Sequence, residues 1–186
     1  MSDIPELTDA QRALEALPEN LVGEIVDGKL YASPRPSPRH AIAAAALEDE
    51  LGPPFKRGRN GPGGWMILLE PEMHLEGQVL VPDLAGWRLE RWKLPDEAFF
   101  TIAPDWICEI VSPPTALLDR RNKMPHYSRA GVVFAWIVDP SARTLESYRS
   151  AGDGTWVLLG THGDEDKIRA APFEAIQLDL SLLWGG

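Results

Sequence analysis

Short apolar runs recur along this chain, separated by polar stretches that contain glycine or proline. Runs of about four to eight residues with apolar side chains on both faces are typical of strands inside a sheet. The pattern predicts strands at 65–70, 79–87, 106–111 and 132–138, followed by a meander at 144–149 and 155–159. A hairpin is expected over 23–32, because Asp27-Gly28 is a favoured two-residue turn between short apolar stretches.

Three segments are expected to be helical. Residues 3–17 have a short amphipathic pattern, and the alanine-rich segment 39–51 favours a helix that ends at Gly52-Pro53-Pro54. A third helix is expected from 115 to about 130, kinked or split by Pro125. This order of elements predicts an α/β fold: a mixed sheet flanked by helices, with an N-terminal hairpin and a C-terminal meander.

Two carboxylates occupy positions where a buried strand would normally avoid them. Asp83 lies within the apolar run 79–87, and Glu109 lies within the next one. Because side chains alternate along a strand, Glu109 shares its face with Ile107 and Val111 and should be buried in a central strand. An ionised carboxylate is costly there unless something pairs with it. A divalent cation is the natural partner for two such groups.

Strand geometry favours Asp83 with Glu109 as the pair. Adjacent strands lie about 4.8 Å apart, so the two carboxylates would share an ion that bonds oxygens near 2.1 Å. Asp105 is a competing partner for Glu109, but four residues along one strand separate side chains by about 13 Å. Asp96 precedes a loop-like stretch and is the weaker choice.

The composition narrows the class of protein. With 186 residues, 44% apolar content and seven tryptophans, the chain is expected to fold as a single domain over 1–186. Its single cysteine excludes an internal disulfide framework and a cysteine-based zinc site, so we expect Cys108 to be a core residue in the reducing cytoplasm. The first residues lack the features of a signal peptide, and no apolar run approaches the length of a membrane span.

The net charge of −10 argues against tight non-specific binding of nucleic acid, which relies on lysine and arginine. Small basic groups do occur, such as Arg120, Arg121 and Lys123. Eighteen basic residues spread over a surface produce such groups by chance. The charge still leaves room for a short basic channel.

Several motifs occur together in this sequence: Val81-Pro82-Asp83-Leu84-Ala85-Gly86-Trp87, the stretch from Pro104 to Pro113, Asp119, Lys123, Tyr127, Ala130-Gly131-Val132, and Trp136-Ile137-Val138-Asp139-Pro140. With them the chain resembles the bacterial restriction endonuclease-like family, a former domain of unknown function placed in the PD-(D/E)XK nuclease superfamily. The resemblance covers nearly the whole chain. It implies a four-stranded mixed core sheet with flanking helices and Mg²⁺-dependent hydrolysis of phosphodiester bonds.

The resemblance also implies roles for individual acids. Asp83 matches the aspartate of the superfamily motif and Glu109 its second acid, so both would bind Mg²⁺ or Mn²⁺. Glu70 and Glu24 are candidates for a third acid, and Glu70 is slightly favoured because it directly precedes the Asp83 hairpin. For both, a solvated glutamate at a strand end is the more common situation. The histidines show no ligand spacing and are expected to be surface or packing residues: His40, His74, His126 and His162.

The lysine of the superfamily motif is missing from its usual place, which Val111 occupies. Lys123 would substitute for it from the following helix. Asp119, Lys123 and Tyr127 follow one another at i, i+4 and i+8, so they lie near one face of that helix. The alternative is a surface pair of Asp119 and Lys123 with Tyr127 packed nearby.

The function that follows is a Mg²⁺-dependent nuclease acting on nucleic acid, with DNA favoured, in the cytoplasm. A catalytically inactive nuclease-fold module for binding or homodimerisation is the first alternative, favoured by the missing strand lysine and the acidic charge. A hydrolase of small phosphoesters is the second, since a negative surface would suit such a substrate better than duplex DNA.

Overall fold

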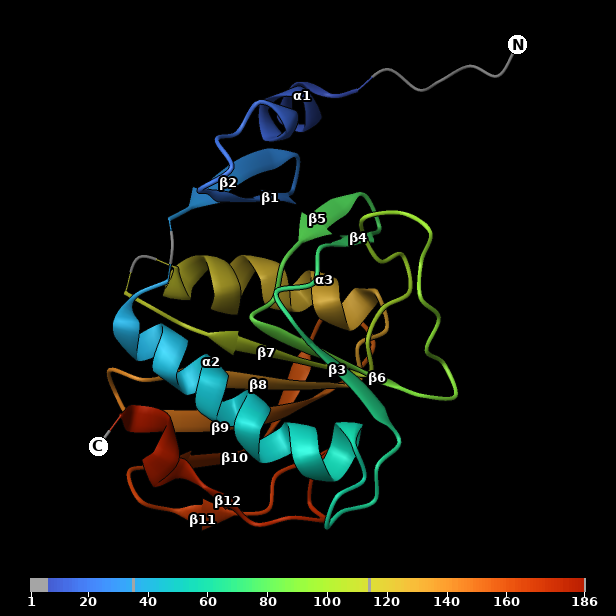
Figure 1. Cartoon of the computed structure of the whole chain (residues 1–186). Helices are drawn as coiled ribbons and strands as arrows, with labels where there is room; N and C mark the ends of the chain where they lie inside the picture. Colours follow the sequence, from blue (N-terminus) through green and yellow to red (C-terminus); the bar gives the residue numbers. More distant parts are fainter. Residues whose placement is uncertain (1–6, 35, 114, 186) are drawn as a thin grey trace.

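The computed structural model of this chain describes residues 7–34, 36–113 and 115–185. Its largest sheet contains β3 (Trp65–Leu69), β6 (Leu84–Arg88), β7 (Trp106–Ile110), β8 (Phe134–Asp139), β9 (Thr144–Ser150) and β10 (Trp156–Gly163). The strand order is β10-β9-β8-β7-β6-β3 (Figure 1). β7 and β8 run parallel, and all other neighbours in this sheet are antiparallel. The mixed sheet and the C-terminal meander of β9 and β10 are therefore confirmed.

Helices lie on both sides of this sheet (Figure 1). On one side is α2 (Pro38–Leu51), which ends at the predicted residue but is followed by a wider, π-helical turn, η1 (Gly52–Lys56). The turn tolerates its two prolines because they occupy its first positions, where a missing N–H costs little. It closes with a hydrogen bond from the N–H of Arg57 to the carbonyl of Gly52.

The third predicted helix is divided next to Pro125. Its first part is the π-helical segment η2 (Leu118–Lys123), and its second part is α3 (Met124–Arg129). Proline lacks the N–H that an α-helix needs, and η2 widens the helix just before it. The division was expected, whereas the π-helical form of η2 was not. Gly131, with a φ of 98°, follows the end of α3.

β7 is the central strand that its apolar sequence predicted. All of its residues are buried. Cys108 faces the hydrophobic cluster that includes α2, and Ile107 faces the cluster on the other side of the sheet. Glu109 alternates onto the side of Ile107, as predicted. The burial of Cys108 also raises the pKa of its thiol well above the usual value, as befits a core residue.

A second, four-stranded antiparallel sheet was not predicted. It has the order β2-β1-β5-β4, with β1 (Val22–Val26), β2 (Lys29–Ser33), β4 (Met73–Leu75) and β5 (Gln78–Leu80). β1 and β2 form the expected hairpin around Asp27-Gly28, and both turn residues have positive φ. The apolar run 79–87 is not one strand, because it divides between β5 in this sheet and β6 in the large one. Pro82 cannot donate to a ladder, so the chain bends there and Asp83 lies in the bend.

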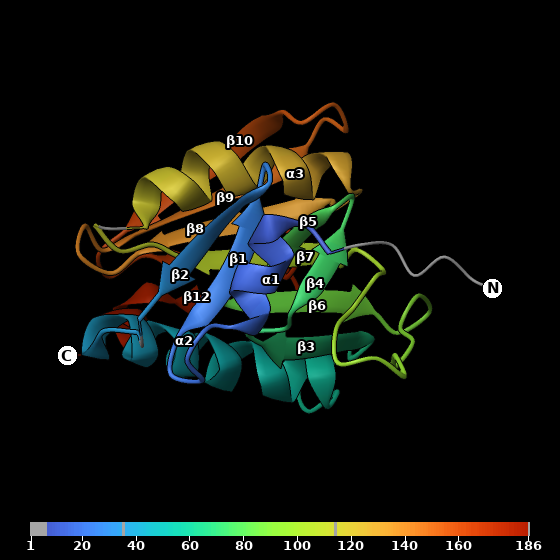
Figure 2. The ribbon, with the colours of Figure 1, turned by 90° about the horizontal axis from the view of Figure 1, so that it is seen from above.

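The N-terminal helix α1 (Asp9–Glu15) lies on the four-stranded sheet, as Figure 2 shows. The part of the predicted helix at 3–6 lies outside the described residues. At the other end of the chain, β11 (Lys167–Ile168) pairs with β12 (Leu178–Asp179), and the short 3-10 helix η3 (Leu180–Trp184) packs near α2. Among the helices of the described ranges, none has the length and apolar character that crossing a membrane requires.

Candidate active site

Acidic side chains from several elements meet at a cavity of about 320 Å³ beside the C-terminal end of β7. Its walls come from the β1–β2 hairpin, the start of α2, the bend before β6, the end of β7 and η2. The ionisable residues that line it are Glu24, His40, Glu70, Asp83, Glu109, Asp119 and Lys123. Tyr127, the remaining candidate from the sequence, lies behind this wall in contact with Glu109.

Lys123 is the centre of the charged cluster. Its Nζ lies 2.8 Å from Glu24 Oε1, 2.8 Å from Glu109 Oε1 and 3.4 Å from Asp119 Oδ1. The side chain is only 2% exposed, so the alternative of a surface pair with Asp119 is wrong. Burial alone would lower the pKa of Lys123, but the charges of Glu109, Tyr127, Glu24 and Asp119 raise it well above the usual value. The lysine is therefore charged and paired.

Asp83 lies across from Glu109. The register of β6 and β7 pairs Leu84 with Cys108, and its continuation by one residue brings Asp83 opposite Glu109. Asp83 Oδ2 accepts a hydrogen bond of 2.5 Å from the N–H of Ile110. Both carboxylates line the same cavity, so a ligand there would have both within its surroundings.

His40 is the residue that sequence reasoning missed. Its Nε2 lies 2.8 Å from Asp83 Oδ1, and its buried Nδ1 has no hydrogen-bond partner in the described part of the chain. Burial by itself lowers the pKa of this imidazole, but the hydrogen bond and charge of Asp83 raise it above the ordinary value. The search for ligand spacing failed because the partner of His40 lies on a distant bend. The sequence does place His40 in the first turn of a helix, because Ser37 is a favourable N-cap and Pro38 a favourable first residue.

Glu24 and Glu70 differ in their surroundings. Glu24 is only 6% exposed and accepts a hydrogen bond from the N–H of Val81 at 2.7 Å in addition to its ion pair with Lys123. The expectation of a solvated glutamate is therefore wrong for Glu24. Glu70 follows β3 with a φ of 46°, and its N–H donates to the carbonyl of Asp83 at 3.0 Å. Both line the cavity, but Glu24 has the closer contact with the charged cluster.

Negative charge exceeds positive charge in this cluster. Burial raises the pKa of Glu109 well above the usual value, and the carboxylates of Asp119, Asp83 and Glu24 add to the effect against the opposing charge of Lys123. The pKa of Asp119 is raised as well, again by burial first. Ionising these carboxyl groups therefore costs free energy, and a bound cation would reduce that cost.

The donor set fits a hard divalent cation, since Mg²⁺ and Mn²⁺ prefer carboxylate oxygens. Asp83 and Glu109 are the residues that would bind it. The contacts of Glu109 with Lys123 and Tyr127 both use Oε1, which leaves Oε2 for a ligand. Within the described ranges, however, there is no group of three or more His, Cys, Asp or Glu side chains already arranged to hold a metal ion. Water or substrate oxygens would therefore complete the coordination shell of a bound metal ion, as is common for Mg²⁺.

Tyr127 anchors Glu109. Its hydroxyl donates to Glu109 Oε1 at 2.7 Å, and both side chains are buried. We expect Tyr127→Phe to lower the free energy of unfolding by about 1.5–3 kcal/mol, because a buried acid loses a hydrogen-bond donor. Tyr148→Phe is the control, since the Tyr148 hydroxyl donates to the more exposed Glu146 at 3.0 Å; about 1 kcal/mol or less is expected. Urea unfolding measures both, and equal losses would contradict the anchoring role.

Comparisons with known proteins place the chain in a family. No protein with a curated description matches it. A crystal structure of a protein from Anabaena variabilis, described as a putative nuclease belonging to DUF820, has a similar fold with a TM-score of 0.76. The two sequences are 21% identical over 96% of this chain and 98% of the other. A family model described as "Putative restriction endonuclease", Uma2, matches residues 12–181, and the chain therefore belongs to the Uma2 family.

Proposed function

We propose that the protein is a Mg²⁺- or Mn²⁺-dependent nuclease that hydrolyses phosphodiester bonds of nucleic acid, with DNA as the favoured substrate. One observation carries the proposal: Asp83 and Glu109 line the same cavity, with Asp83 hydrogen-bonded to the N–H of Ile110 and the buried Lys123 2.8 Å from Glu109. Family membership and the nuclease description of the similar structure support it. A reaction at this site would need neither a thiol nor a hydroxyl nucleophile from the protein.

Asp83 and Glu109 would bind the metal and fix its position. A bound divalent ion polarises a scissile phosphate and lowers the pKa of a coordinated water. Lys123 holds the carboxylate of Glu109 in place and supplies positive charge at the cavity wall, where it would stabilise the charge that develops on the phosphate. His40 keeps Asp83 oriented through its contact with Oδ1. The chain thus supplies both the ligands and the groups that orient them.

The start of α2 gives an anionic substrate a favourable approach. Ser37 and His40 line the cavity, so the N-terminus of this 14-residue helix faces it. Helix N-termini favour anions through their N–H groups and the helix dipole, and the first turn of α2 contains no acidic residue. Arg39 is exposed in the same turn. This local arrangement supports phosphate binding in a protein whose net charge is −10.

A homodimer remains part of the proposal. The surface that supports it is the edge strand β10, where Val157, Leu158 and Leu159 are 56%, 53% and 48% exposed. An apolar edge strand is a template for pairing with another chain.

Cleavage assays with and without metal test the function. Wild type is expected to cut DNA in Mg²⁺ or Mn²⁺ and to be inactive in EDTA. Glu109→Gln should lower the rate by about 100-fold or more, since a lost metal ligand removes several kcal/mol and each tenfold corresponds to about 1.4 kcal/mol. Single-stranded DNA, duplex DNA, RNA and model phosphodiesters would be compared to define the substrate.

Glu146→Gln is the matched control for this assay. Glu109 pairs with Ile137 of β8, and Ile137 pairs with Glu146 of β9. Glu146 is therefore an acid at the matching position of the sheet, two strands away from Glu109. It does not line the cavity and pairs with Arg120. The control should cut at the wild-type rate. Equal cleavage by Glu109→Gln, or cleavage that survives EDTA, would reject the site; no cleavage of any substrate would favour the inactive module.

A further inference from the structure

The β1–β2 hairpin, residues 22–33, covers the cavity of the candidate site. Val22, Glu24 and Ser33 of the hairpin line one side of this cavity, and the bend before β6 and the end of β7 line the other. Figure 2, a view from above, shows the hairpin crossing over the large sheet. Beneath it, the side chains of Asp83 and Glu109 are only 17% and 3% exposed. A phosphate that reacts there must therefore pass below the surface of the protein.

Two polar contacts join the hairpin to the helical segment η2–α3. Glu24 Oε1 lies 2.8 Å from Lys123 Nζ, and the same oxygen accepts a hydrogen bond of 2.7 Å from the N–H of Val81. At the tip of the hairpin, Asp27 Oδ1 lies 3.0 Å from Nε2 of His126. Lifting the hairpin would separate the buried charges of Glu24 and Lys123, which is strongly unfavourable. The cavity is therefore not expected to widen readily for a larger substrate.

The size of the cavity favours one nucleic-acid strand. Its volume of about 320 Å³ is at the lower end of the range for ligand sites in proteins. A phosphate that enters it carries its own sugar and base along. In a duplex this base is paired and stacked, so either the second strand must enter as well or the base pair must open. An unpaired strand meets neither obstacle.

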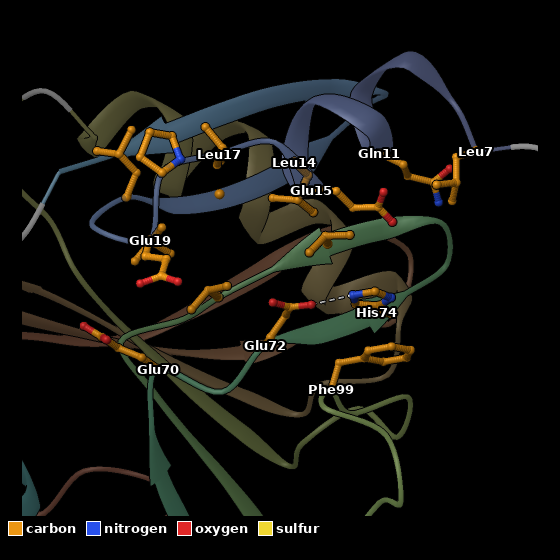
Figure 3. Close-up of a pocket in the computed structure, with 16 residues that line it drawn as sticks. Leu7, Gln11, Leu14, Glu15, Leu17, Glu19, Glu70, Glu72, His74 and Phe99 are labelled. Carbon is orange, nitrogen blue, oxygen red and sulfur yellow. Dashed lines mark hydrogen bonds and ion pairs between the residues drawn. The ribbon is translucent and has the colours of Figure 1, made fainter.

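The surroundings of the cavity disfavour a second row of phosphates. A larger cavity, of about 530 Å³, adjoins the first one and shares Val22, Glu70 and Val81 with it. Its lining within the described residues contains no lysine or arginine but four carboxylates, shown in Figure 3: Glu15, Glu19, Glu70 and Glu72. Phosphates would be repelled on this side, whereas the start of α2, which lines only the first cavity, has no acidic residue in its first turn. A duplex carries more charge per unit length than a single strand, so it would meet more of this repulsion.

We propose that the site takes a single strand of DNA, or the unpaired part of a duplex such as an overhang or a flap, and excludes fully paired DNA. The strand would lie between the hairpin and the start of α2. Exposed prolines at the rim of the cavity, Pro34, Pro36 and Pro113, would contact base faces that a duplex hides by stacking. This inference names the substrate of the proposed nuclease and rests on that function, whereas the binding preference can be measured without cleavage.

Binding to two forms of one oligonucleotide tests the strand preference. A labelled strand of about 12 nucleotides, a length within the site sizes of single-strand binding domains, is compared with its duplex by fluorescence anisotropy. Ca²⁺ is used in this assay because it takes the same kind of oxygen ligands as Mg²⁺, and a gel verifies that the DNA stays intact. The strand is expected to bind at least about tenfold more tightly, because the duplex must first open a base pair at a cost in free energy. In Mn²⁺, cleavage should be confined to the strand and to unpaired overhangs.

Ser33→Trp and Ala32→Trp locate the bound strand. Ser33 lines the first cavity, while Ala32 is its exposed neighbour on β2 and points to the opposite face, outside both cavities. Ser33→Trp should fill the cavity and weaken binding of the strand by about tenfold or more, because the base loses its place there. Ala32→Trp adds the same bulk at the adjacent position and should bind the strand as wild type does.

Equal affinity for strand and duplex, no binding of either, or equal binding by the two tryptophan variants would overturn the inference. Duplex that is cleaved as fast as the single strand would also overturn it, and would leave the nuclease function standing. If the strand binds in the cavity but is cut in no metal, the strand preference stands and the nuclease proposal fails.

Discussion

Replacing Lys123 by methionine is expected to lower the free energy of unfolding by about 3–5 kcal/mol at neutral pH, the range found when one partner of a buried ion pair is removed. The side chain is 2% exposed and pairs with Glu24, Glu109 and Asp119 at once. Methionine fills a similar volume without the charge. The lost free energy of unfolding therefore comes from carboxylates without a positive partner, and not from a cavity. Urea unfolding followed by circular dichroism measures it.

Lys56→Met is the matched control. Lys56 pairs with Glu48 at 3.5 Å, but the two side chains are 29% and 26% exposed. Partly exposed pairs of this kind contribute about 0–1 kcal/mol, because water screens them. Similar losses of unfolding free energy for the two variants would mean that the carboxylates around Lys123 do not need its charge.

The deficit of Lys123→Met should depend on pH. Burial already raises the pKa of Glu109 and of Asp119 in wild type, and loss of the ammonium charge raises both further. A carboxyl whose folded pKa exceeds its unfolded pKa costs stability above the unfolded value and costs none once it is protonated. The difference between variant and wild type should therefore be largest at neutral pH and shrink toward about pH 4, near the unfolded carboxyl pKa values. A deficit that grows on acidification would contradict this account.

Asp83→Asn is expected to abolish Mn²⁺ binding, with affinity reduced by about 100-fold or more, because a neutral amide replaces an anionic oxygen ligand. Asparagine keeps an oxygen that can accept the N–H of Ile110, so the bend before β6 should persist. Calorimetric titration of Mn²⁺ at low ionic strength provides the measurement. Mn²⁺ binding by the variant at wild-type affinity would remove Asp83 from the metal site.

Asp105→Asn controls for the loss of any buried acid near β7. Asp105 is 8% exposed, accepts the N–H of Arg88 and pairs with Arg91 at 2.5 Å, away from the cavity. Its variant should bind Mn²⁺ as wild type does, although it loses an ion pair. The two aspartates thus separate metal binding from general effects of charge removal.

The parts of the fold that depend on residues close together in the sequence were predictable. The hairpin at Asp27-Gly28, the helix α2 and the buried central strand β7 follow from turn chemistry, helix propensity and apolar runs. The apolar run 79–87 was misjudged because a strand and a strand-bend-strand have the same apolar pattern. Only Pro82 indicated the bend, and β5 pairs with β1, far back in the chain, as well as with the neighbouring β4.

The candidate site was predictable only in part for the same reason. Asp83 and Glu109 were found because each interrupts an apolar run. The burial of Glu24 and the contact of His40 with Asp83 depend on which distant elements pack together, and no local pattern encodes that. Lys123 was found through the family resemblance, because its spacing alone favoured a surface pair with Asp119.

The route by which Lys123 reaches Glu109 affects how related proteins can be detected. A search pattern that requires a lysine two positions after the second acid would discard this chain at Val111, although an ammonium nitrogen lies 2.8 Å from that acid. The π-helical segment η2, which ends at Lys123, sets the direction of that side chain, so one inserted or deleted residue there would turn it toward another side of the helix. Alignments of distant relatives should therefore match the lysine by its position in space and treat its spacing from the acid as variable.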